Sequence, residues 1–248
     1  IAKEKKYKFF FAMVDHGLRK NSALEAQQVK TLLRKKDINL TILKNKKKIS
    51  NNIQKKARDI RYNLLSKFSN KKKSKSIIVA HHQDDQIETF LIRLSRGSGV
   101  EGLSSMQEVT NLNKKTYLIR PLLDFKKDDL MRIAKNEFGK VISDPSNKNK
   151  KFLRTNIREL KNNLIKKGLN VEKIILSIKN ISSTRDAIDF YVARSIKDYV
   201  IFKNEITVLN LNKFLKEPHE IRFRIINIIV KNRSNSYYPP RSKKVTNL

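Results

Sequence analysis

The chain has 248 residues and a formal net charge of +33, which leaves room for one α/β domain of moderate size and a smaller one. The excess of Lys and Arg favours a polyanionic partner, above all nucleic acid. The absence of cysteine excludes disulfides, zinc–thiolate sites and cysteine nucleophiles. No apolar run approaches the roughly 20 residues of a membrane span, and no signal peptide is visible. We therefore expect a cytoplasmic protein without a membrane partner.

The first part of the chain alternates between predicted strands and helices. Short apolar runs predict strands at 8–14 and 39–43, and apolar residues at helical spacing predict helices at 22–33 and 53–68. Ser22, with Glu25 three residues later, predicts a capping box at the first helix. The alternation predicts an α/β fold with a doubly wound parallel sheet.

A third predicted strand, Ile77 to Ala80, ends in a run of polar residues. His81 and His82 close the strand, and Asp84 and Asp85 then lie at the expected start of a helix, where carboxylates complement the helix dipole. In an open α/β sheet, the carboxyl edge of the strands is where ligands bind. The sequence therefore predicts a functional site at this edge.

The helix that follows has two distinct faces. Its apolar stripe is predicted to contain Ile87, Phe90, Leu91 and Leu94. Asp85, Glu88 and Thr89 fall at i, i+3 and i+4 on another face. A helix in the preceding segment carries Arg58, Arg61 and Tyr62 on one side, which on residue pattern alone is best interpreted as a solvated basic face.

Further helices and strands are predicted in the rest of the chain. Asp124 is predicted to cap a helix at 126–138 with Leu130, Ile133 and Ala134 facing inward. Further strands are predicted at 117–120, 200–202 and 206–209, and further helices at 153–167, 171–197 and 220–230. The change in character near 167–170 predicts a catalytic domain at 1–167 and a smaller, mainly helical domain at 168–248.

Two chemical interpretations of the polar strand ends remain open from the residues alone. In one, His16, His81, His82, Asp84 and Asp85 bind metals, as in a two-metal phosphohydrolase. In the other, the acids position Mg²⁺ with ATP and orient an amine nucleophile, while basic residues bind RNA. A third possibility, from a different class, is a non-catalytic RNA-binding protein.

Seven motifs, in order, carry a resemblance to one family. They are VDHGLR at 14–19, ARDIRY at 57–62, AHHQDDQIET at 80–89, RLSRGSG at 93–99, RPLL at 120–123, DPSN at 144–147 and RTNIR at 154–158. With these motifs the chain resembles the tRNA(Ile)-lysidine synthetases, of the N-type ATP pyrophosphatase group. The resemblance covers most of residues 10–160.

The resemblance implies a two-step ligation. ATP adenylates the wobble cytidine of an isoleucine tRNA with a CAU anticodon, and the amine of free lysine then displaces AMP to give lysidine. It also implies that 168–248 binds tRNA. Sequence does not fix the oligomeric state, and a homodimer is one of the states considered.

The resemblance also implies roles for individual residues. Asp85 and Glu88 would hold the amines of lysine or Mg²⁺, and His82 and Asp84 would shape the nucleotide end of the site. Arg61, Arg154 and Arg158 would contact phosphates of ATP or tRNA, and Arg96 and Ser98 would lie near the same cleft.

One family feature is missing. The Ser-Gly-Gly-x-Asp-Ser loop, whose backbone N–H groups cradle pyrophosphate, does not occur in the sequence. Since the first residue is Ile1, we expect the printed chain to lack its natural start, including the first strand and this loop. We further expect that this 248-residue species is inactive, that the full protein is an active ligase, and that more chain follows Leu248.

Overall fold

The computed structural model describes residues 8–19, 21–46, 49–113, 115–142, 153–204 and 206–234. The chain divides into two compact units. The first unit comprises 1–86 and 107–159, and the second comprises 87–106 and 160–248. The functional domain boundary expected near 167–170 stays a prediction.

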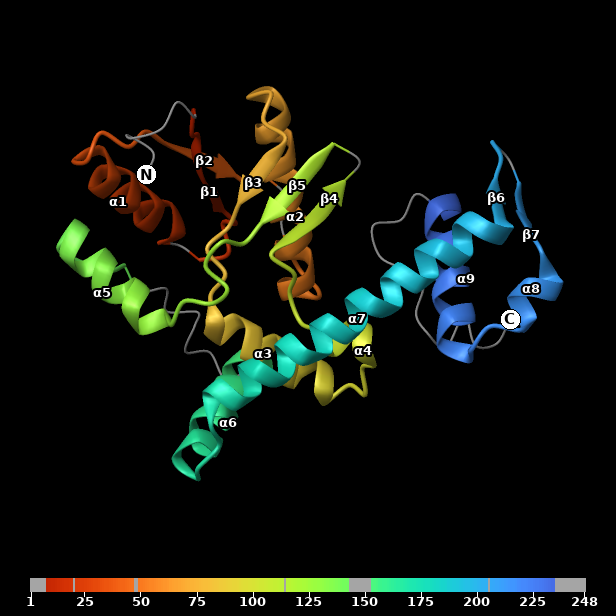
Figure 1. The fold of residues 1–248 in the computed structure, drawn as a ribbon. Coiled ribbons are helices and arrows are strands. Elements are labelled where there is room, and N and C mark those ends of the chain that lie inside the picture. Colours follow the sequence, from red (N-terminus) through yellow and green to blue (C-terminus); the bar gives the residue numbers. More distant parts are fainter. Residues whose placement is uncertain are drawn as a thin grey trace. The chain divides into compact units, whose positions relative to one another are not determined.

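Parallel strand pairs form the first unit. β1 (Phe11–Asp15) pairs in parallel with β2 (Leu40–Lys44), and β3 (Ser76–Ile78) pairs in parallel with β5 (Thr116–Ile119). β4 (Val109–Asn113), which the sequence did not predict, pairs antiparallel with β5 (Figure 1). The predicted α/β class with parallel strands is confirmed, with an antiparallel edge strand added to it.

Three complete helices accompany these strands: α1 (Ser22–Arg34), α2 (Ile53–Lys71) and α5 (Lys127–Phe138). α2 packs against both β1 and β3, which places its side chains next to both strand pairs. A buried cluster of Ile77, Leu112 and Leu118, with Tyr62 and Leu65 packed on it, joins α2 to the β3–β5–β4 sheet. Burial of this apolar surface is the main force that holds α2 in place.

Two helix starts differ from the sequence predictions. Asn21, not Ser22, is the N-cap of α1, and Glu25 makes a bidentate ion pair with Arg19 instead of capping, with N–O distances of 3.0 and 2.7 Å. Likewise Lys126, not Asp124, is the N-cap of α5. An available guanidinium group competes successfully for a carboxylate that would otherwise close a capping box.

Two residues of the predicted apolar helix faces are exposed. Leu94, predicted in the apolar stripe of α3, is 51 % exposed, and Ile133, predicted to face inward from α5, is 55 % exposed. Each lies on a helix whose other apolar positions are better covered: Ile87 is only 1 % exposed. Helical spacing identifies an apolar stripe but not how far the neighbouring elements extend along it.

The second unit is mainly helical, as predicted. Its elements are α4 (Val100–Leu103), α7 (Val171–Tyr199), β6 (Val200–Phe202), β7 (Thr207–Leu209), α8 (Leu211–Leu215) and α9 (His219–Ser234). The predicted strand pair is confirmed as the antiparallel hairpin β6–β7. One core cluster contains Val192, Tyr199, Val200, Ile221 and Ile225, and a second contains Ile87, Ile174 and Ile178. α3 (Gln83–Leu94) and α6 (Leu153–Lys166) each contribute residues to both units.

Two buried arginines of the second unit have structural roles. Arg224, 7 % exposed, donates to Asp189 at 2.6 Å and to Glu220 at 2.8 Å. Arg185, 5 % exposed, donates to Ser104 Oγ at 3.0 Å. These guanidinium groups are paired with carboxylates or hydroxyls, which buried charges require. They therefore join α4, α7 and α9 and are not free to bind a ligand.

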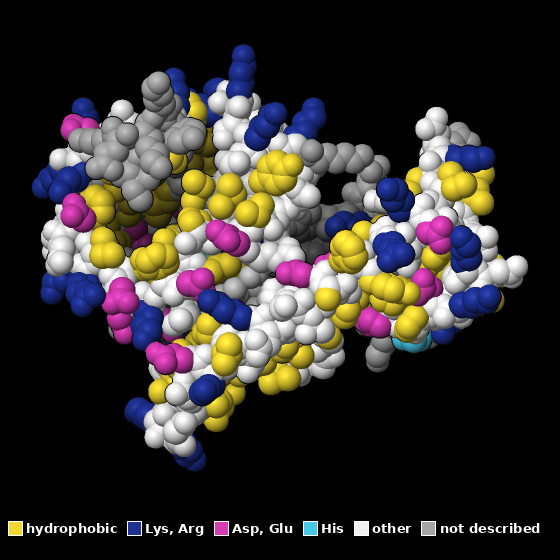
Figure 2. All heavy atoms as spheres, in the orientation of Figure 1, with side chains coloured by type: hydrophobic (Ala, Val, Ile, Leu, Met, Phe, Trp, Pro, Cys, Tyr) yellow, Lys and Arg dark blue, Asp and Glu magenta, His cyan; other side chains and the backbone are white. Residues whose placement is uncertain are grey.

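Basic side chains are spread widely over the protein. On the face drawn in Figure 2, the dark blue Lys and Arg side chains are scattered and do not gather in one patch. Net charge therefore supports a polyanionic partner without locating its binding site. Among the helices that the structure describes, none is both long and apolar enough to cross a membrane.

Candidate functional site

The end of β1 supplies the first polar group of the site. Asp15, 8 % exposed, accepts a hydrogen bond from Gly17 N–H at 3.0 Å, and Gly17 adopts a φ of +64°. This left-handed conformation suits glycine, and it turns the chain sharply after the strand. The Asn45 side chain donates to the His16 carbonyl at 3.3 Å. The turn is therefore fixed from both sides and presents His16 at the carboxyl end of β1.

The end of β3 supplies the second group, as the sequence predicted. His81 and His82 follow the strand, and α3 begins at Gln83, whose N–H donates to the Phe125 carbonyl at 3.0 Å. Asp85 Oδ2 accepts from His82 N–H at 3.1 Å and lies 3.5 Å from His82 Nε2. Asp84 Oδ2 lies 4.0 Å from His82 Nδ1. Both acids lie in the first turn of α3, where the helix dipole favours negative charge.

Arginines from two helices approach these groups. Arg58 and Arg61 come from α2 and Arg154 from α6, and all three interact electrostatically with one another or with His81. Arg58 also lies over the Tyr62 ring, 5.0 Å from its centroid, in a cation–π contact. The interpretation of this side of α2 as a solvated basic face is therefore incomplete, since tertiary packing turns part of it toward β1 and β3.

Among the described residues, the arginines of this histidine–arginine cluster (His16, His81, Arg58, Arg61 and Arg154) lack carboxylate partners. Within the described part of the chain, no carboxylate forms an ion pair with Arg58, Arg61 or Arg154. Burial of the guanidinium group lowers the pKa of Arg61, and the charges of Arg58 and Arg154 lower it further, although the side chain as a whole remains exposed. Guanidinium groups held together in this way attract phosphate oxygens.

Two histidines near these arginines, His16 and His81, are held in the neutral state. Burial lowers the pKa of His81 to about 4; the positive charges of Arg120, Arg58 and Arg154 lower it further, and Asp85 opposes them. Burial, followed by the charge of Arg61, also lowers the pKa of His16. Neither ring nitrogen of His16, nor Nδ1 of His81, has a hydrogen-bond partner among the described residues. These buried nitrogens can therefore donate a hydrogen bond to a ligand or accept one from it.

The neutral state of His81 predicts a pH dependence of stability. Because its pKa falls from 6.5 in the unfolded chain to about 4 in the folded one, the unfolded chain binds more protons between these values. Stability is therefore fully present above pH 6.5 and falls as the pH drops toward 4. Since His81 keeps some solvent contact, we expect a loss of about 2 kcal/mol.

Urea denaturation at pH 7 and pH 4.5 measures this effect. The free energy of unfolding of wild type should fall more on acidification than that of a His81→Asn variant. His219→Asn, which removes an exposed histidine, should follow the wild-type profile. Equal acid sensitivity of wild type and His81→Asn would contradict the expected titration.

The other predicted site residues fall in different places. Arg158 lies one turn after Arg154 on α6, in the first unit, whereas Glu88, Arg96 and Ser98 belong to the second unit. The DPSN motif at 144–147 lies outside the described residues. Roles for all of these residues stay predictions.

Two residues near the cluster were not among the predicted site residues. Arg58 was set aside because a basic helix face in a lysine-rich chain carries little signal, although it lies in the ARDIRY motif. Arg120 is 5 % exposed and donates to the Gln107 carbonyl at 2.7 Å and to Thr110 Oγ1 at 3.1 Å. These bonds indicate that Arg120 braces β4 against β5.

The carboxylates of α3 do not form part of a two-metal centre among the described residues. Asp85, in the first unit, is 9 % exposed, and Glu88, in the second unit, is 2 % exposed. Carboxylates are the protein ligands that Mg²⁺ commonly takes together with phosphate oxygens. Across the described residues, no group of three or more His, Asp and Glu is arranged to hold a metal. The two-metal interpretation based on His16, His81, His82, Asp84 and Asp85 is therefore not supported.

Comparison with known proteins finds relatives that share one description. A curated tRNA(Ile)-lysidine synthase from Wolbachia sp. subsp. Brugia malayi is 33 % identical over 231 residues, covering 92 % of this chain and 53 % of the relative. A second, from Rhodopseudomonas palustris, is 38 % identical over 163 residues, covering 65 % of this chain and 47 % of the relative. The chain thus spans about half the length of these relatives.

A solved structure shares the fold. The U34-tRNA thiolase NcsA from Methanococcus maripaludis, with its [4Fe-4S] cluster, superposes with a TM-score of 0.60 at 16 % identity, covering 73 % of this chain and 64 % of that one. The PP-loop domain family model matches residues 1–165, which include β1 to β5 and the whole histidine–arginine cluster. The chain therefore belongs to the PP-loop domain family.

Proposed function

We propose that the protein ligates free lysine to the wobble cytidine of an isoleucine tRNA with a CAU anticodon, using ATP, in the manner of the tRNA(Ile)-lysidine synthases that it resembles. The observation that carries the proposal is the cluster at the ends of β1 and β3, where arginines without a carboxylate partner among the described residues act electrostatically on neutral histidines beside the buried Asp85. The names of the curated relatives and the ATP-using PP-loop family support it. A cytoplasmic location is part of the same proposal.

In this proposal, the cluster serves both chemical steps. Arg61, Arg154 and Arg158 bind phosphates, so that negative charge is stabilised as the base oxygen attacks ATP and pyrophosphate leaves. The adenylated oxygen is then a good leaving group. The lysine amine, held near Asp85 and Glu88, attacks the base carbon in its deprotonated form, and AMP departs.

The remaining groups of the site make smaller contributions to binding the nucleotide and Mg²⁺. His82 and Asp84 shape the nucleotide end, and Arg96 and Ser98 are proposed to face the same ligands. Mg²⁺, when bound, would neutralise phosphate charge, with Asp85 and Glu88 as its protein ligands. The neutral rings of His16 and His81 can hydrogen-bond the nucleotide without adding repulsive charge to the arginines.

The test is lysine-dependent AMP release by the full-length protein on an isoleucine tRNA with a CAU anticodon. We expect AMP, pyrophosphate and lysidine in equal amounts, and no AMP when lysine or tRNA is left out. Phosphate release without lysine would favour a phosphohydrolase instead. Binding of tRNA with no response to ATP would favour a non-catalytic RNA-binding protein, and either result would overturn the proposal.

A further inference from the structure

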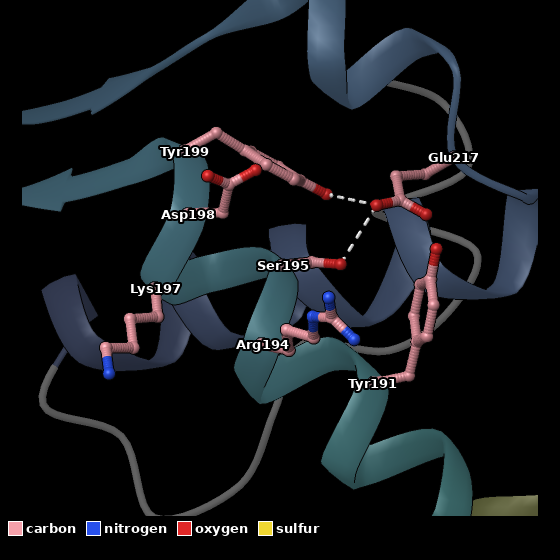
Figure 3. A pocket seen from close by; sticks show the side chains of 7 residues that line it. All are labelled: Tyr191, Arg194, Ser195, Lys197, Asp198, Tyr199 and Glu217. Atoms are coloured by element: carbon pink, nitrogen blue, oxygen red, sulfur yellow. Dashed lines mark hydrogen bonds between the residues drawn. The ribbon is translucent and has the colours of Figure 1, made fainter.

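A cavity of about 660 Å³ lies within the second unit, between the C-terminal end of α7 and the segment before α9. It is far along the chain from the motifs of the candidate site. Figure 3 shows the side chains that line it: Tyr191, Arg194, Ser195, Lys197, Asp198, Tyr199 and Glu217. The proposed ligation chemistry uses none of them.

A carboxylate is held firmly at the inner wall of this cavity. Glu217 Oε1 accepts hydrogen bonds from Ser195 Oγ at 2.9 Å and from the Tyr199 hydroxyl at 3.0 Å. Ser195 and Tyr199 are 6 % and 7 % exposed, and their hydrogen bonds to Glu217 are partly buried. A hydrogen bond to Glu217 also raises the pKa of Tyr191. The cavity is therefore a built polar site with a fixed acceptor, rather than a chance hollow between side chains.

The mouth of the cavity combines aromatic and basic side chains. Tyr191 is 46 % exposed. Arg194 lies three residues from Tyr191 and three from Lys197 on α7, so it is a neighbour of each on the helix surface. Asp198 is paired with Lys213 at 3.0 Å, which leaves Arg194 and Lys197 as the cations at the mouth.

This combination matches the chemistry of an unpaired nucleotide. An exposed tyrosine ring stacks on a base, cations bind the adjoining phosphates, and a fixed carboxylate accepts from an N–H group on the base edge. A small anion would bind to the cations but would make no contact that requires the exposed Tyr191 ring. A net charge of +33 further favours a polyanionic strand over a neutral ligand.

We propose that this cavity binds one unpaired nucleotide of the tRNA substrate, with the base against Tyr191, its edge toward Glu217 and its phosphates on Arg194 and Lys197. The inference rests on the proposed function, because it takes RNA as the substrate. It adds an RNA-binding site on α7, outside the family-matched residues 1–165.

Affinity measurements on the 248-residue chain test the site. We expect Tyr191→Ala to weaken binding of a CAU isoleucine tRNA by about tenfold, whereas Tyr191→Phe, which keeps the ring, stays within about twofold of wild type. Tyr117→Ala provides a matched control, since Tyr117 is 49 % exposed on β5 of the first unit. Circular dichroism checks that each variant is folded.

A fluorescence measurement gives a readout that fold damage cannot imitate. The chain has no tryptophan, so Tyr191→Trp creates a single reporter at the mouth of the cavity. Its emission should be quenched by a single-stranded oligoribonucleotide, and much less in the double variant that also carries Arg194→Gln. Quenching by free lysine alone, or none by RNA, would overturn the proposal.

The two proposals fail in different ways. If Tyr191→Ala binds tRNA as tightly as wild type while the full-length protein forms lysidine, the nucleotide site is wrong and the enzyme activity stands. If Tyr191→Ala loses affinity for tRNA and the full-length wild-type protein forms no lysidine, the site stands as an RNA-binding site and the proposed reaction is wrong.

Discussion

Replacing Asp85 by asparagine in the full-length protein should lower lysine-dependent AMP release by about 100-fold, equivalent to about 2.7 kcal/mol of transition-state stabilisation. The carboxylate is 9 % exposed and accepts from His82 N–H at 3.1 Å. The asparagine oxygen can keep that hydrogen bond, so the start of α3 should survive. What is lost is the negative charge that would hold the ammonium group of lysine or a magnesium ion.

Pyrophosphate release without lysine distinguishes these two roles of Asp85. If Asp85 holds lysine, adenylation should continue in Asp85→Asn and only the second step should slow. If it holds Mg²⁺, both steps should slow together. Glu88→Gln should show the same pattern as Asp85→Asn, because the two carboxylates lie three residues apart on α3.

A matched control measures the general effect of losing an acidic residue from the first turn of a helix. Asp128 lies in the first turn of α5, a helix of the same 12-residue length as α3, and its side chain is exposed. Asp128→Asn should leave AMP release within about twofold of wild type. If Asp85→Asn behaved like Asp128→Asn, the carboxylate would have no part in the reaction.

The order of strands and helices was predictable because apolar periodicity is a local property of the chain. The β3–α3 junction, the long helix α7 and the β6–β7 hairpin all follow from residues that are close in sequence. β4 was not predicted because its sequence, VTNLN, has only one buried residue, Leu112. A strand of this kind is defined by the neighbour with which it pairs, which no local pattern records.

The candidate site was predictable in part for the same reason. His82, Asp84 and Asp85 are adjacent in sequence, and their mutual contacts follow from the start of one helix. The approach of Arg58 and Arg154 to His81 depends on how α2 and α6 pack against the strands. Basic residues on a helix face have the same pattern whether they meet solvent or a ligand site, so only the fold separates Arg58 from the many solvated lysines.

The arginine cluster leads to the second large prediction, in which stability and ligand affinity change in opposite directions. Arg58, Arg61 and Arg154 repel one another in the unliganded protein, since within the described residues no carboxylate pairs with them. Arg154→Gln removes one of these charges. We therefore expect the free energy of unfolding without ligand to stay unchanged or rise, in contrast to most substitutions at half-buried positions.

The same substitution should weaken ATP binding, because a charge-assisted hydrogen bond to phosphate contributes about 1.5–3 kcal/mol. We expect the dissociation constant of ATP, measured by calorimetry on the full-length protein, to rise at least about tenfold for Arg154→Gln and for Arg61→Gln. Arg132→Gln serves as the control, since Arg132 is 74 % exposed and pairs with Asp129 on α5. It should not change ATP affinity.

Salt separates repulsion from ordinary packing in this cluster. Raising the ionic strength from about 0.05 to 0.5 M screens like charges, so wild type should gain stability relative to Arg154→Gln and the difference between them should shrink. A cluster built only for structure would behave in the opposite way: Arg154→Gln would unfold more easily at both salt concentrations and bind ATP as tightly as wild type. That pair of results would remove the arginines from the binding site and, with them, the electrostatic basis for adenylyl transfer at the ends of β1 and β3.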